Sequence, residues 1–159
     1  NTTKRQGGVM PNVTDATNGE WMISVTVAGL ERVKQGTGFD LCSLITGEPL
    51  ERFFHDLVLT VNCGYWLVKP QADAQGITET QFKERFSGDS LDSLQSAILD
   101  ALPDFFPRPR REVLSRMISE LRRSTEHAIA QILAVPSSNA VTKSADVSES
   151  IPESTHSDV

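Results

Sequence analysis

The stretch PLERFFHDLVLTVNCGYWLV, residues 49–68, is the most apolar run of the chain and decides the fold. Because apolar residues occur on almost every side of it, we predict a buried central helix. Pro49 suits its first turn, and Pro70 is expected to end it. Gly64, unfavourable inside a helix, indicates close packing by a neighbouring element. The large side chains at helical spacing are Phe53, Phe54, Leu57, Val58, Val61, Tyr65 and Val68.

A small β-hairpin is predicted before this helix. Residues 21–27, WMISVTV, alternate apolar and polar side chains, which is typical of a strand with one buried face. Asn18 and Gly19 precede this strand, and the pair favours a two-residue type I′ turn because both residues tolerate positive φ. The other strand is expected around residues 9–16, where Pro11 weakens the pattern.

Two short helical pieces are predicted between the hairpin and the central helix. From Ala28 the apolar spacing becomes helical, and Gly36 and Gly38 are expected to stop this first piece. Residues 39–45 form the second piece, which Gly47 ends.

Three more helices are predicted after the central one. Thr78 and Gln81 form a capping box that opens a short helix. Asp89 or Ser90 is expected to cap the next helix. Its apolar face consists of Leu91, Leu94, Ile98 and Leu102. The last helix, residues 109–134, has an apolar stripe of Val113, Leu114, Met117, Ile118, Leu121, Ala128, Ile129, Ile132 and Leu133.

The stretch DALPDFFPRPRR, residues 100–111, joins the last two helices. Its three prolines restrict the backbone, so we predict a stiff elbow that turns the last helix back onto the central one. Phe105 and Phe106, at its centre, are interpreted as core anchors.

The 159 residues suit one domain, and we predict a mainly α fold of the α+β type. It consists of a small N-terminal β-hairpin followed by a compact bundle of about five helices with a long C-terminal helix. The single globular domain is expected over residues 9–135. Residues 1–8 are expected to be disordered. So is the tail, residues 136–159, which is rich in Ser, Thr and acidic residues and lacks an apolar face.

The sequence contains no pattern that favours catalysis or cofactor binding. The three histidines, His55, His127 and His156, lack partners at metal-ligand spacing, and no phosphate-binding or nucleophile motif is present. We therefore predict no catalytic, cofactor-binding or metal site and favour a protein that is not an enzyme; an enzyme with a pocket near His55 is the alternative. Without a secretion signal or an apolar run long enough for a membrane, a cytoplasmic protein is expected.

Arginines gather between Arg108 and Arg123, although the chain has a net charge of −6. This basic cluster keeps open an alternative function, a small nucleic-acid-binding regulator. The acidic balance and the lack of interleaved aromatic residues make nucleic acid a less favoured partner. The other interpretation is the polar face of an amphipathic helix, with some arginines paired to carboxylates.

The order of these elements resembles a family of uncharacterised phage proteins from the tail gene module. The segments that carry the resemblance are VNCGYWLVKPQADAQGIT, then ETQFKERFSGDSLDSLQSAILDALPDFFP, then the arginine-rich last helix, and it covers about residues 19–134. One departure from the family pattern is the polar stretch Thr60 to Gly64.

The resemblance implies a tail assembly chaperone that keeps an apolar, helical tape-measure protein soluble in the cytoplasm of the host bacterium during virion morphogenesis. It implies no catalytic residues, and it leaves self-association open. We predict that the partner protein contacts the elbow and the start of the last helix. The predicted partner-binding residues are Phe105, Phe106, Arg108, Arg110, Arg111, Met117 and Leu121.

Overall fold

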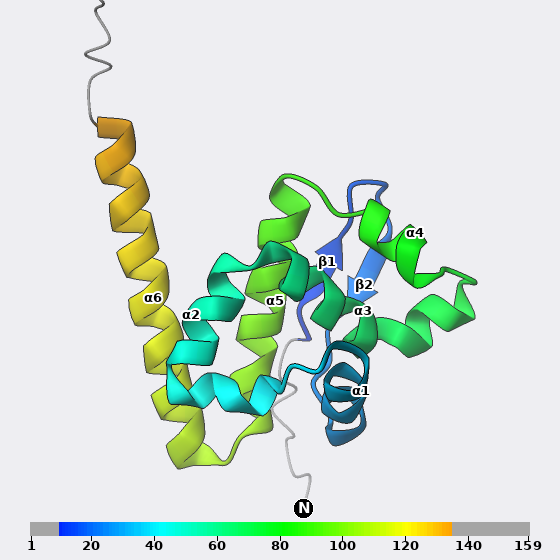
Figure 1. The fold of residues 1–159 in the computed structure, drawn as a ribbon, viewed down its shortest axis with the longest axis horizontal. Coiled ribbons are helices and arrows are strands. Elements are labelled where there is room, and N and C mark those ends of the chain that lie inside the picture. Colours follow the sequence, from blue (N-terminus) through cyan, green and yellow to red (C-terminus); the bar gives the residue numbers. More distant parts are fainter. Residues whose placement is uncertain (1–9, 135–159) are drawn as a thin grey trace, which may run out of the picture.

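The computed structural model describes residues 10–134, and it confirms a mainly helical fold with an N-terminal hairpin and a long last helix (Figure 1). The predicted segments 1–8 and 136–159 lie outside the described residues. The elements are β1 (Asn12–Thr14), β2 (Glu20–Met22), α1 (Val27–Thr37), the 3-10 helix η1 (Leu41–Thr46), α2 (Glu48–His55), α3 (Leu57–Ala74), α4 (Glu79–Glu84), α5 (Asp89–Phe105) and α6 (Arg108–Ala134).

The predicted hairpin is present, but its turn and length differ from the prediction. The Asp15 N–H donates to the Gly19 carbonyl at 2.8 Å and the Asn18 N–H to the Asp15 carbonyl at 3.0 Å, which leaves a three-residue loop. Only Asn18 is left-handed, with φ 65°, so the type I′ turn was wrong. β2 ends at Met22, and Val27 begins α1 instead of extending the strand.

The predicted central helix over residues 49–68 is two helices, α2 and α3, that break at Asp56. The Asp56 carboxylate caps α3 by accepting the Leu59 N–H at 2.9 Å. At the open end of α2, the side-chain amide of Gln95 from α5 donates to the carbonyls of Phe53 at 3.2 Å and Phe54 at 2.9 Å. These bonds, with one from the Thr60 hydroxyl to the Phe53 carbonyl at 3.3 Å, satisfy carbonyl groups at the break.

Because of the break, part of the apolar run 49–68 is exposed to solvent. Leu57 and Val58, predicted to pack inside, lie on the first turn of α3 and are exposed. Pro70 does not end the helix, because α3 continues to Ala74. The polar Thr60 is fully buried, and its hydroxyl donates to the Asp56 carbonyl at 3.1 Å.

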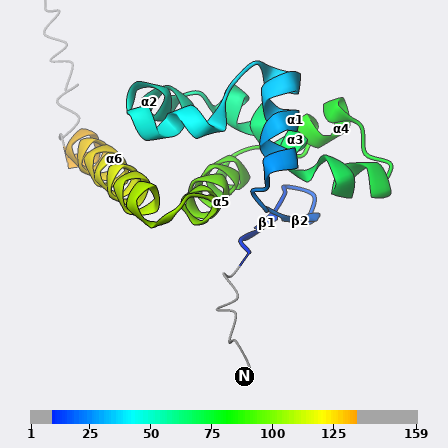
Figure 2. The ribbon, with the colours of Figure 1, turned by 90° about the horizontal axis from the view of Figure 1, so that it is seen from below.

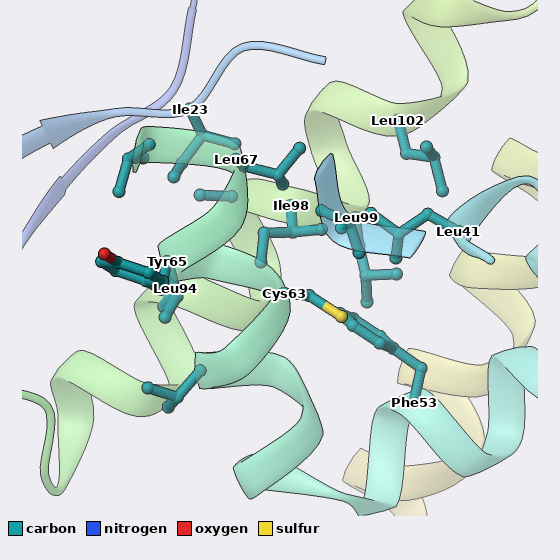
Figure 3. Packing of buried hydrophobic residues seen from close by; sticks show 14 of the residues in the cluster. Ile23, Leu41, Phe53, Cys63, Tyr65, Leu67, Leu94, Ile98, Leu99 and Leu102 are labelled. Carbon is teal, nitrogen blue, oxygen red and sulfur yellow. The ribbon is translucent and has the colours of Figure 1, made fainter. Parts of the chain in front are cut away.

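α3 is the centre of the fold, in contact with α1, α2, α4 and α5 (Figure 1). Figure 3 shows Cys63 and Leu67 of α3 among Phe53 of α2 and Ile98 and Leu99 of α5.

Two glycines show how closely the helices approach one another. Gly64 packs as predicted, since a Cβ there would lie 3.0 Å from a methyl carbon of Leu94. Gly36 does not stop α1: it lies inside the helix, where a Cβ would overlap the ring of Trp66. The stop is Gly38, which is left-handed with φ 73°.

Two local predictions for the later helices have different outcomes. The capping box of Thr78 and Gln81 is present at the start of α4. α5 is capped by neither Asp89 nor Ser90, because the cap residue is Gly88 and the Ser90 hydroxyl bonds to Ser87 instead.

The predicted elbow is present as Phe106 and Pro107 between α5 and α6. It turns α6 onto α5 and η1, not onto the central helix α3 as predicted. Leu114 and Ile118 of α6 are buried in this contact. The end of the helix extends beyond the other elements of the fold, which together are called the body (Figure 1). Figure 2 shows α2 and α6 at one end of the molecule and α4 at the other.

Candidate functional site

An open groove lies between α6 and the corner where η1 meets α2. Its volume is about 460 Å³, and its lining is mostly apolar. The apolar side chains are Leu50 of α2 and Met117 and Leu121 of α6. The remaining lining residues are Gly47, Glu51, Arg116, Glu120 and Ser124.

The local sequence explains why this corner stays open. Gly47 has φ 92°, a conformation that side chains rarely adopt, and it lets η1 pass directly into α2. A Cβ there would lie 3.7 Å from the end of the Met117 side chain, so glycine also leaves room above Met117. Met117 and Leu121 are one helix turn apart, and both are half-buried. The groove therefore has an apolar floor that is partly exposed to solvent.

The structure brings together only two of the seven predicted partner-binding residues, Met117 and Leu121. Phe106 is buried in the core, as its interpretation as an anchor predicted. Phe105 is half-buried and lines a separate cavity of about 250 Å³ beside the hairpin. Arg108 and Arg110 are exposed on the first turn of α6, away from the groove.

Three arginines of the basic cluster are paired with acidic groups. Arg122 Nη1 lies 2.9 Å from Asp100, and Arg123 pairs with Glu120 one turn away. Arg111 Nε lies 3.8 Å from the Asp104 carboxylate, and Arg111 Nη2 donates to the main-chain carbonyl of Asp104 at 3.1 Å. This pairing agrees with the amphipathic-helix interpretation and reduces the charge available for phosphates. The nucleic-acid alternative stays a prediction.

The groups that could carry chemistry are scattered. His55 is exposed at the end of α2, with its ring edge-on to Phe54 at 5.9 Å. Burial raises the pKa of the Cys63 thiol to about 12, so this thiol is held protonated. Within residues 10–134, no three His, Cys, Asp or Glu side chains lie together as a metal-binding group.

Sequence reasoning missed half of the groove. Leu50 and Glu51 belonged to the predicted central helix, and only the break at Asp56 makes α2 a separate wall. The sequence predicted the apolar stripe of the last helix, but not that Ile129, Ile132 and Leu133 at its end are 51%, 72% and 80% exposed. The regular stripe gave no signal that its second half is uncovered.

Comparison with protein-family models, curated protein sequences and solved structures gives no match. No helix within residues 10–134 combines the length and the apolar character needed to cross a membrane.

Proposed function

We propose that the protein is a non-catalytic assembly chaperone that holds an apolar helix face of a partner protein in the groove between α2 and α6. The partner suggested by the sequence resemblance is the tape-measure protein of a phage tail. The observation that carries the proposal is the groove itself, where the half-buried Met117 and Leu121 form an apolar floor above the buried Leu50. Grooves of this kind bind amphipathic helices through apolar anchors one turn apart.

The rim of the groove carries charged side chains, and the charges of a partner must match them. Glu51 of α2 and Arg116 and Glu120 of α6 line the groove, so both signs of charge surround the apolar floor. A helix with apolar anchors and mixed charges on its flanks fits this arrangement, whereas a uniformly acidic nucleic-acid backbone does not. The helical protein is therefore the favoured partner, and nucleic acid is the less favoured one.

Co-expression with a candidate phage tape-measure protein tests the proposal. A tagged full-length chain should capture that protein and increase its soluble fraction. Met117→Glu should abolish capture, because it places a carboxylate on the apolar floor. Val27→Glu is the control: Val27 is 62% exposed, lies on α1 away from the groove, and should leave capture intact.

Circular dichroism of each purified variant shows whether it has folded. Failure of the unaltered chain to bind or solubilise the tape-measure protein would contradict the proposal. Equal capture by the Met117→Glu and Val27→Glu variants would show that the groove is not the binding site.

A further inference from the structure

The last eight residues of α6, HAIAQILA (127–134), have no Asp, Glu, Lys or Arg, although 23% of the whole chain is charged. All eight are exposed. Of the nine large apolar side chains that are exposed within residues 10–134, three lie in this short segment: Ile129, Ile132 and Leu133. A solvated helix end normally carries charges, so this uncharged end has the composition of a contact surface.

The uncharged end continues the face by which α6 packs on the body. Leu114 and Ile118, buried against the body, share this face with Ile129 and Ile132 further along. The body lies beside the helix as far as Ile129. At the boundary, Ile129 and Phe54 line a cavity of about 180 Å³. Beyond it, none of the residues 10–134 covers Ile132 or Leu133.

We propose that the uncharged end of α6, residues 127–134, is a self-association surface whose occupant is the same end of a second copy, packed antiparallel. The self-complementary composition favours a second copy, because two identical ends meet without bringing like charges together. In a parallel pair, the bodies attached to the same helix face would collide. Antiparallel ends that overlap over two turns keep the bodies apart.

The spacing of the apolar residues fits a two-fold axis. An axis between Ala130 and Gln131 places Ile129 of each copy opposite Ile132 of the other. The same axis places the small Ala128 of each copy opposite Leu133 of the other, so the helices can approach closely there. Only about two turns per copy take part, fewer residues than a standard interface uses, so we expect a dissociation constant of roughly micromolar size or weaker.

Sedimentation equilibrium of the full chain alone tests this surface without any partner protein. The unaltered chain should change from monomer to dimer as its concentration rises. Ile132→Glu should weaken the dimer by about 100-fold or more, because two symmetry-related carboxylates enter the contact. Val27→Glu, the same change at a similarly exposed site on α1, should leave the dimer unchanged. A chain that is monomeric at every concentration, or a dimer that Ile132→Glu leaves intact, overturns the proposal.

Disulfide trapping tests the orientation. In a Cys42→Ser background, a copy with Ile129→Cys and a copy with Ile132→Cys should cross-link to each other faster than to themselves. Faster linkage of like with like indicates a parallel pair and overturns the antiparallel arrangement. The proposed function is tested separately, because loss of the dimer and loss of tape-measure capture are read from variants at different sites.

Discussion

The loop of the hairpin and the end of α6 differ in whether their polar and apolar groups find partners within the chain. Beside the loop, Trp21 of β2 is fully buried; it donates its indole N–H to the carboxylate of Asp15 at 2.9 Å, and its ring lies edge-on to Phe82 at 5.0 Å. At the end of α6, Ile132 and Leu133 are mostly exposed, and no charged side chain accompanies them. The loop region pairs its buried polar groups within the chain, whereas the end of α6 leaves apolar surface uncovered.

The Asp15 carboxylate shows how fully the polar groups of this region are hydrogen-bonded within the chain. Its side chain is fully buried, and it accepts the backbone N–H groups of Thr17 at 2.9 Å and Gly19 at 2.8 Å besides the indole. Arg85 lies 3.6 Å away. A region built this way contributes to folding stability, whereas an uncovered apolar helix end contributes through what it binds. Substitutions in the two regions should therefore affect different measurements.

The largest effect is expected for Trp21→Ala. It removes a fully buried ring that contacts Phe82 and leaves the Asp15 carboxylate without its indole donor. We expect the free energy of unfolding to fall by about 3–5 kcal/mol, measured by urea denaturation. A fall below about 1 kcal/mol would show that the loop of the hairpin is not a centre of stability.

The next effect concerns the charge of Asp15. Burial by itself raises the pKa of this carboxyl group, but hydrogen bonds from Trp21, Thr17 and Gly19 outweigh burial and lower the pKa from 3.8 to about 2. Because the pKa is lower in the folded state, the charge stabilises the fold above about pH 4. This stabilisation is lost as the pH falls towards 2.

Asp15→Asn should therefore lower the free energy of unfolding by about 2 kcal/mol at pH 7. The difference between the two proteins should shrink between pH 4 and 2, which urea denaturation at several pH values measures. A difference that stays constant across this range would show that the carboxylate charge is not the cause. Glu20→Gln, at an exposed neighbour in β2, is the matched control.

A smaller loss is expected at the break between α2 and α3. Gln95→Leu keeps the volume of the buried side chain but removes the amide that donates to Phe53 and Phe54. Leaving these carbonyls without that donor should cost about 1–2 kcal/mol of unfolding free energy, again measured with urea. An unchanged stability would mean that the end of α2 does not depend on α5.

This break also shows what the sequence could predict. The mainly helical fold, the capping box at Thr78 and the presence of an elbow before α6 follow from local spacing and local chemistry, and the structure confirms them. At the break before α3, the Phe54 carbonyl bonds to Gln95, 41 residues further along the chain, and such a distant contact is invisible to periodicity, which predicted one long helix. The turn of the hairpin was misread for a similar reason, because the side chain of Asp15 organises a longer loop than the Asn18-Gly19 pair suggests.

The candidate site was predictable only in part. Met117 and Leu121 could be named because they belong to the apolar stripe of a single helix. The opposite wall, Leu50 and Glu51, comes from an element that the sequence merged with its neighbour. Likewise, periodicity shows that the stripe of α6 is apolar, but not how far the body extends along it. That limit depends on the lengths and packing of α5 and η1.

The smallest effect on monomer stability is expected at the uncovered end of α6. Ile132→Ser replaces a side chain that is 72% exposed in the single chain, so the unfolding free energy at low protein concentration should stay within about 0.5 kcal/mol of the unaltered value. At high concentration the unaltered chain should become more stable than the variant, because self-association stabilises the folded state by mass action. Urea denaturation at two protein concentrations measures both quantities. A large loss at low concentration would mean that Ile132 packs within its own chain, and the contrast with the loop of the hairpin would disappear.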